Sequence, residues 1–109
     1  MRPPIRQLDV FRNPIRAVRT DKPYLVSIQH RFLDDLSMRL MAPLVTRRIL
    51  PLPDVKAWYP EIRIEGENLY LDTTDLAAFP TSMLRDPVMN LEADRYRIMR
   101  AIDLVLTGV

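Results

Sequence analysis

The sequence predicts a small, mainly β antiparallel domain, part barrel and part sheet, that ends in one helix packed against the strands. Most of the chain consists of short apolar or alternating runs separated by turn residues, which is typical of antiparallel strands. The last run is amphipathic with helical spacing. With 109 residues and 48% hydrophobic content, the chain can form one core. At this size a partner subunit commonly buries further apolar surface, so a homo-oligomer is compatible with the composition.

Residues 1–7 are expected to form a loose, proline-rich leader, and residues 8–109 a single domain. The leader has no apolar segment behind its basic residues, and no window approaches the ~20 apolar residues of a membrane span. The chain has no cysteine, which excludes disulfides and thiolate-bound zinc and favours a reducing compartment. We therefore expect an unprocessed, soluble protein of the cytoplasm.

Three strands are predicted in the first half of the chain. Alternation over residues 8–12, ended by Asn13-Pro14, indicates the first strand. Residues 23–29 alternate in the same way and indicate a half-buried second strand. Residues 40–45 form a nearly continuous apolar run, as in a strand covered on both faces. Because Pro43 lacks an N–H, we expect it at an edge or a bulge.

A hairpin is the clearest local feature of the second half. Residues 50–53 contain two prolines, which indicates an irregular crossing. Isoleucines at 62 and 64 and leucines at 69 and 71 then flank residues 65–68, a connection of hairpin length. It contains Gly66, which can adopt a positive φ.

The remaining elements are short until the final helix. Residues 76–80 predict a short strand or turn, and residues 88–91 another short strand. The helix covers about residues 91–106. Asn90 can cap its start and Gly108 provides its stop.

No residue pattern predicts a catalytic, metal or cofactor site. His30 is the single histidine, and with no cysteine it indicates no zinc site. Asp34 and Asp35 are neighbours in a turn and point apart, which makes them a poor acid–base pair. The two glycines of the chain exclude a glycine-rich phosphate loop. Residues 73–75 are read as local turn capping.

The charge pattern favours a protein partner over a polyanion. Sixteen basic and fourteen acidic residues give a net charge of +2, and the basic residues are spread along the chain. Strong phosphate-driven binding is therefore not implied. Fourteen of the sixteen basic residues are arginine, which pairs with carboxylates in a bidentate manner, so an acidic peptide would suit this surface.

Two groups of large side chains have two interpretations each. Trp58 and Tyr59 could stack on bases, but packing beneath the proline-rich crossing is favoured because no aromatic ladder extends them. Five methionines could form an adaptable interface, although core filling is the simpler interpretation. They are Met38, Met41, Met83, Met89 and Met99.

Five segments in order resemble the CcdB family of toxins. They are Val10-Phe11-Arg12-Asn13, Pro23 to Gln29, Arg39 to Val45, Thr73 to Pro80 and Ala101-Ile102-Asp103-Leu104. Each motif is individually weak, but together they cover about residues 8–109 and are hard to meet by chance. The resemblance implies a small SH3-like antiparallel β-barrel of the CcdB and PemK type with a C-terminal helix.

The resemblance also implies a function. Members of this family are homodimeric toxins of type II toxin–antitoxin pairs that bind the DNA gyrase A subunit and trap the enzyme with its DNA cleaved. The implied partner is a CcdA-like antitoxin with a disordered tail that folds on binding. DNA would be contacted only indirectly, through an autoregulating complex with the antitoxin. No cofactor and no catalytic residue is implied.

The family's gyrase-binding end is a Trp-Gly-Ile triplet, which falls on Thr107, Gly108 and Val109. Gly108 matches and Val109 is a conservative change, whereas Thr107 replaces the large aromatic. An aromatic side chain stacked on an arginine in a desolvated groove is worth on the order of 2 kcal/mol. The substitution therefore predicts a weaker contact with gyrase, a different mode of binding to gyrase, or a changed target.

Two alternatives remain. The related PemK and MazF toxins cleave messenger RNA, and here Arg12, Arg16 and Asp75 would have to converge on a phosphate. The second alternative is a homologue that binds the antitoxin but is no longer toxic.

Overall fold

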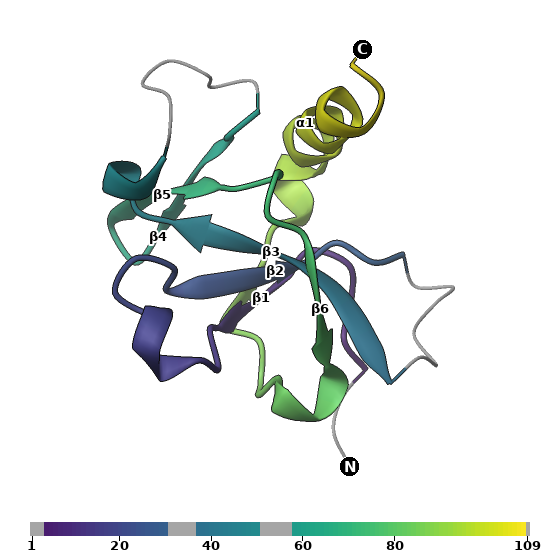
Figure 1. The fold of residues 1–109 in the computed structure, drawn as a ribbon. Coiled ribbons are helices and arrows are strands. Elements are labelled where there is room, and N and C mark those ends of the chain that lie inside the picture. The colour runs from purple at the N-terminus through teal and green to yellow at the C-terminus, as the bar shows by residue number, and fades with distance from the viewer. Residues whose placement is uncertain (1–3, 31–36, 51–57, 109) are drawn as a thin grey trace.

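The computed structural model describes residues 4–30, 37–50 and 58–108. Within these residues seven strands form one antiparallel sheet, and helix α1 (Arg95–Thr107) follows the last strand (Figure 1). The strands are β1 (Asp9–Arg12), β2 (Tyr24–Ser27), β3 (Met38–Val45), β4 (Glu61–Ile64), β5 (Glu67–Leu71), β6 (Ala77–Pro80) and β7 (Met89–Asn90). The predicted class, mainly β with a C-terminal helix, is confirmed.

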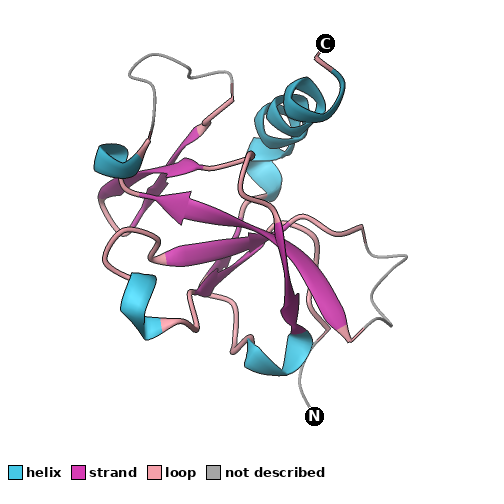
Figure 2. Cartoon of the chain, viewed as in Figure 1, coloured by secondary structure: helices cyan, strands magenta, loops and turns pink. Residues whose placement is uncertain are grey.

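The sheet is strongly curled into a half-barrel (Figure 2). Its strands follow the order β4-β5-β3-β2-β1-β7, and β6 pairs with β3 outside this path. β3 is the central strand, since β2 covers one of its edges while β5 and β6 share the other. Among the described residues β4 and β7 do not pair with each other, so the barrel is open on that side.

Pro43 lies in this central strand, not at the edge or bulge that we expected. It follows Met41, the last residue paired with β6, and precedes Leu44, the first paired with β5. Its carbonyl accepts a hydrogen bond from the N–H of Asp72 (2.9 Å), so the backbone groups of Pro43 face away from β2. The missing N–H thus falls where β3 changes partners, between the residues paired with β6 and those paired with β5.

The expectation of a half-buried β2 was wrong, because all four of its residues are buried. Tyr24 and Val26 belong to the larger apolar cluster, which α1 covers with Ile98 and Ile102. Leu25 faces the other way into a smaller cluster. The curl of the sheet therefore gives it a core on both faces.

The smaller cluster also receives part of the segment that we expected to be a loose leader. Ile5 is buried there, beside Phe11 and Leu84. The side-chain amide of Gln7 donates to the Ile28 carbonyl (2.9 Å). Ile5 and Gln7 therefore anchor this segment to the domain, whereas Pro4 and Arg6 are exposed.

The hairpin is confirmed and is tighter than the sequence indicated. Ile64 pairs with Glu67, so only Glu65 and Gly66 connect β4 to β5. Both have positive φ values, 50° and 82°. This is the backbone that a two-residue hairpin turn with right-handed strand twist requires.

The C-terminal helix begins with a short 3-10 turn (Glu92–Asp94) that continues into α1. The side-chain carbonyl of Asn90 accepts from the Glu92 N–H (2.8 Å), but the N-cap residue of this turn is Leu91 and not Asn90 as expected. At the other end Gly108 has φ 77°, and its N–H donates to the Leu104 carbonyl (2.9 Å). Gly108 is therefore the helix stop that the sequence predicted.

The ambiguous large side chains divide between core and surface. Tyr59 is buried, whereas Trp58 is 41% exposed. Met41 is buried and Met99 packs against the larger cluster, but three methionines are exposed. These are Met38, Met83 and Met89. Core filling thus explains only part of the methionine content.

Asp34, Asp35 and residues 51–53 of the crossing lie outside the described residues. Within the described part, no helix has both the length and the apolar character needed to cross a bilayer.

Candidate functional site

The C-terminal end is the first candidate, and α1 holds it rigidly. Ile98 and Ile102 anchor the helix in the larger cluster. Two arginines of its first turn fasten it to the sheet side of the molecule: Arg95 donates to the Gln7 side chain (2.6 Å) and Arg97 to the Glu61 carbonyl (2.8 Å). Figure 1 shows the last turn of α1 pointing away from the sheet.

The final residues are open to solvent. Leu106 is 67% exposed, and Thr107 and Gly108 are also exposed. The Thr107 hydroxyl donates to the Asp103 carbonyl one turn earlier (2.7 Å). Val109, the third residue assigned to this site, lies outside the described residues. The structure thus presents Thr107 and Gly108 at the end of a fixed helix, accessible to a partner.

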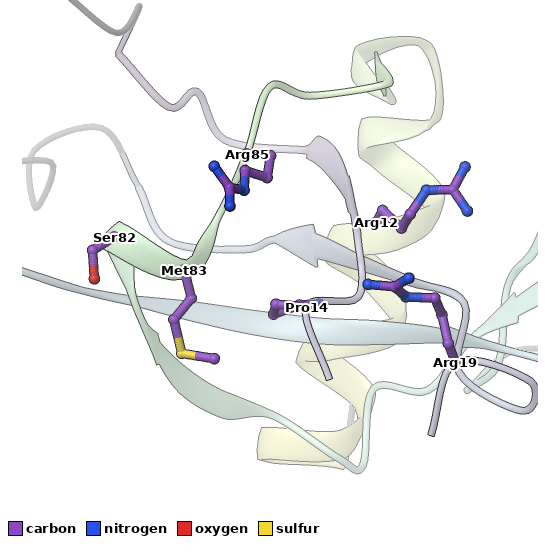
Figure 3. Close-up of a pocket in the computed structure, with 6 residues that line it drawn as sticks. All are labelled: Arg12, Pro14, Arg19, Ser82, Met83 and Arg85. Atoms are coloured by element: carbon purple, nitrogen blue, oxygen red, sulfur yellow. The ribbon is translucent and has the colours of Figure 1, made fainter. Parts of the chain in front are cut away.

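A second candidate is a half-open pocket of about 290 Å³. Six residues line it: Arg12, Pro14, Arg19, Ser82, Met83 and Arg85 (Figure 3). We call this the arginine pocket. It combines three guanidinium groups with a hydroxyl and two apolar side chains, and no carboxylate lines it. An anion is the ligand that such a lining favours.

The loop after β1 is folded so that Arg12 and Arg19 line the same pocket. Asn13 is buried and closes the loop with its side chain, which donates to the Lys22 carbonyl and accepts from the Ile15 N–H, both at 2.9 Å. The Nε of Arg19 donates to the Asn13 carbonyl (2.8 Å), directly after Arg12 in the chain. Arg12 itself lies over the Tyr24 ring, 5.8 Å from the ring centre. Both guanidinium groups are therefore held in place.

The opposite wall comes from a distant part of the sequence. Leu84 is fully buried in the smaller cluster, which fixes the short segment carrying Ser82, Met83 and Arg85. The N–H of Val88 donates to the Val10 carbonyl (2.8 Å) and places this segment beside β1. Pairing between β1 and β7 thus builds the pocket.

The ion pairs of the described chain lie elsewhere. Carboxylates are paired with Lys22, Arg48, Arg95 and Arg97. Within residues 4–30, 37–50 and 58–108, none of the salt bridges involves Arg12, Arg19 or Arg85. The pocket therefore carries three positive charges that the described chain does not neutralise.

The residues considered for RNA cleavage are not gathered in this pocket. Arg12 lines it, but Arg16 and Asp75 do not. Asp75 instead pairs with the Lys22 ammonium (2.9 Å). A phosphate bound beside Arg12 would meet no carboxylate base among the lining residues.

Shifted pKa values occur at the helix start and on the hairpin. The hydrogen bond with Arg95 lowers the pKa of Glu92. On the hairpin, the hydrogen bond that the Tyr70 hydroxyl donates to Glu61 raises the pKa of Tyr70. Both pairs are exposed and structural, and neither lines the arginine pocket.

No pattern in the sequence indicated that the arginine pocket would form. The excess of arginine was noted and Arg12 was singled out, but Arg19, Ser82 and Arg85 carried no local signal. They meet only after β7 pairs with β1. The exposed Met83 at the same place was considered only as one of a scattered set.

Comparison with models of known protein families shows a match over nearly the whole chain. A family model described as CcdB protein matches residues 7–108.

Proposed function

The chain belongs to the CcdB family of toxin–antitoxin toxins, and we propose that it acts by poisoning DNA gyrase with its C-terminal end. The family match carries this proposal. The exposed last turn of α1 supports the choice of site, because Thr107 and Gly108 are accessible while the helix behind them is fixed in the core. Val109 completes the proposed contact.

The action we propose is binding without bond-making. The described residues of the C-terminal end contribute an apolar side chain, a hydroxyl and a glycine, which can occupy a groove but supply no general acid or base. We further propose a cytoplasmic homodimer that presents two such ends to the gyrase A subunit. A CcdA-like antitoxin would neutralise it and would connect the complex to DNA for autoregulation.

The test is removal of Gly108 and Val109. Gly108 contributes the cap on the last turn, and the core residues of α1 lie before it. We therefore expect thermal unfolding to change little. Growth arrest and the yield of gyrase-linked DNA breaks should both be lost.

Tyr96→Ala is the matched control. Tyr96 is 75% exposed on the same helix, three turns before its end. It should leave poisoning intact. If the truncated protein still arrests growth and still traps cleaved DNA, the assigned site is wrong.

The two alternatives have distinct outcomes in the same set of assays. Cleavage of RNA by the purified protein that is lost in Arg16→Ala would favour a ribonuclease over a gyrase poison. Tight antitoxin binding without growth arrest would indicate the non-toxic homologue. Arrest that the antitoxin relieves, together with gyrase-linked breaks, is the result we expect.

A further inference from the structure

The turn that leads into β1 holds a leucine in a backbone conformation that its side chain does not favour. Leu8 has φ 72°, in the left-handed region, and its side chain is fully buried. A bulky residue adopts this region only at a conformational cost. The Asp9 N–H donates to the Arg6 carbonyl (3.1 Å), which closes a turn over residues 6–9. Such a strained backbone persists where the surrounding structure holds it in place.

The backbone of Leu8 joins the sheet to the residues that lead into the helix. Its N–H donates to the Ser27 carbonyl at the end of β2 (2.6 Å), and its own carbonyl accepts from the Leu91 N–H (3.0 Å). The side chain of Asp9, a buried residue, accepts from the Asn90 side-chain amide (2.9 Å). The turn over residues 6–9 therefore lies between β2 and the start of the C-terminal helical segment.

Gln7 completes this link with both ends of its side-chain amide. Its Nε2 donates to the Ile28 carbonyl just after β2 (2.9 Å), and its Oε1 accepts from Arg95, the first residue of α1 (2.6 Å). Its backbone carbonyl accepts from the Asn90 side chain (3.1 Å). Arg95 also donates two hydrogen bonds to the Glu92 carboxylate, of 2.8 and 2.6 Å. One residue thus ties β2 to the first turn of α1.

These hydrogen bonds can set the direction of α1, which apolar burial alone does not. Ile98 and Ile102 hold the helix on the larger cluster, but apolar contacts are non-directional. Hydrogen bonds weaken steeply when their angle changes, so bonds at the first turn restrict the tilt of the helix. The helix has 13 residues. At about 1.5 Å per residue, a tilt of about 10° at its start would displace its end by about 3 Å.

We propose that Gln7 is a positioning residue for the C-terminal end. By joining β2 to Arg95, it fixes the angle at which α1 presents Thr107 and Gly108. This inference rests on the proposed function only for what the end contacts, which is gyrase. The mobility of the helix end can be measured without gyrase, so the two ideas can fail separately.

The experiment follows the helix end with a nitroxide label. The chain contains no cysteine, so Leu106→Cys gives a single labelling site at a residue that is 67% exposed. Electron paramagnetic resonance is recorded on the full chain, diluted with an excess of unlabelled chain of the same variant to prevent coupling between labels. Gln7→Met removes both side-chain hydrogen bonds and keeps a side chain of similar length. It should shift the spectrum toward a more mobile label, and Gln7→Ala should give the same shift.

Two controls separate positioning from a general loss of stability. Gly66→Ala strains the hairpin turn and changes none of the hydrogen bonds of Gln7, so it should leave the label spectrum unchanged. If Gln7 acts through Arg95, Gln7→Met should have no further effect once Arg95→Met is present. An unchanged spectrum for Gln7→Met, an equal shift for Gly66→Ala, or full additivity with Arg95→Met would each overturn the proposal.

A second measurement relates the position of the end to gyrase poisoning and uses chains without the label. A mobile end loses more entropy on binding, so Gln7→Met should need about threefold or more protein to trap the same amount of cleaved DNA. Gly66→Ala should need no more than the wild-type chain. Unchanged poisoning by Gln7→Met despite a shifted spectrum would count against the C-terminal contact, and therefore against the proposed function alone. A wild-type chain that does not poison gyrase would do the same.

Discussion

Replacing Thr107 with tryptophan tests the assigned site by gain of function. Thr107 is the last residue of α1 and is exposed, so a larger side chain meets no core atoms. The change removes the exposed hydrogen bond to the Asp103 carbonyl. Surface substitutions of this kind usually alter the free energy of unfolding by no more than about 0.5 kcal/mol. Folding should therefore be unaffected, and any change in potency reflects the contact with gyrase.

The expected magnitude follows from what an aromatic anchor contributes to an interface. Tryptophan residues at the centre of a contact commonly contribute about 2 kcal/mol or more. Each 1.4 kcal/mol corresponds to about a tenfold change in affinity. We therefore expect Thr107→Trp to trap cleaved DNA at a concentration at least about tenfold lower than the wild-type chain requires.

The assay is the yield of gyrase–DNA cleavage complexes as a function of toxin concentration. Thr107→Ala separates loss of the hydroxyl from gain of the ring, and it should change potency little. Tyr96→Trp adds an indole to the same helix far from its end and should have no effect. An unchanged curve for Thr107→Trp, or an equal gain for Tyr96→Trp, would place the gyrase contact elsewhere.

Two further predictions concern the scaffold. Gly66→Ala should lower the free energy of unfolding by about 1 kcal/mol, measured by urea denaturation. Gly66 has φ 82° and an added Cβ would meet no atom within 4 Å, so backbone strain is the only cost of the substitution. An unchanged midpoint of the urea unfolding curve would contradict this prediction. Glu92, whose pKa is held below 4.5 by the hydrogen bond with Arg95, stabilises the folded chain above its unfolded-state pKa, and this stabilisation is lost as the pH falls through the lowered folded value. The melting temperature of the wild-type chain should therefore exceed that of Glu92→Gln at neutral pH, and this difference should vanish in acid. A difference in melting temperature that persists in acid would refute the role assigned to the Glu92–Arg95 pair.

The local features of this chain could be predicted from sequence because each depends on neighbouring residues. Gly66 indicated the position of the hairpin turn, and Gly108 indicated the end of α1. Both adopt a positive φ, which costs other residues conformational energy. Asn90 accepts a hydrogen bond from the first N–H of the 3-10 turn, although it lies one residue before the N-cap position. The ordered motifs were also sufficient to identify the family, which the match over residues 7–108 confirmed.

The global arrangement could not be predicted in this way. Pro43 was assigned to an edge because its missing N–H suggests one, but the structure places it in the central strand where β3 changes partners. β2 was expected to have one solvent-exposed face, but the smaller cluster covers that face. Ile5, from the segment expected to be a leader, belongs to the same cluster. Alternation reports which residues share a face of a strand and does not report what covers each face.

The sequence by itself thus determined the elements, the helix end and the family, since these follow from local backbone preferences and from motifs in order. Only the tertiary structure decided that Arg85 lies in one pocket with Arg12 and Arg19. The physical reason is strand pairing over a long separation in the chain. The hydrogen bond from the Val88 N–H to the Val10 carbonyl brings the two walls together, and no local pattern encodes that pairing.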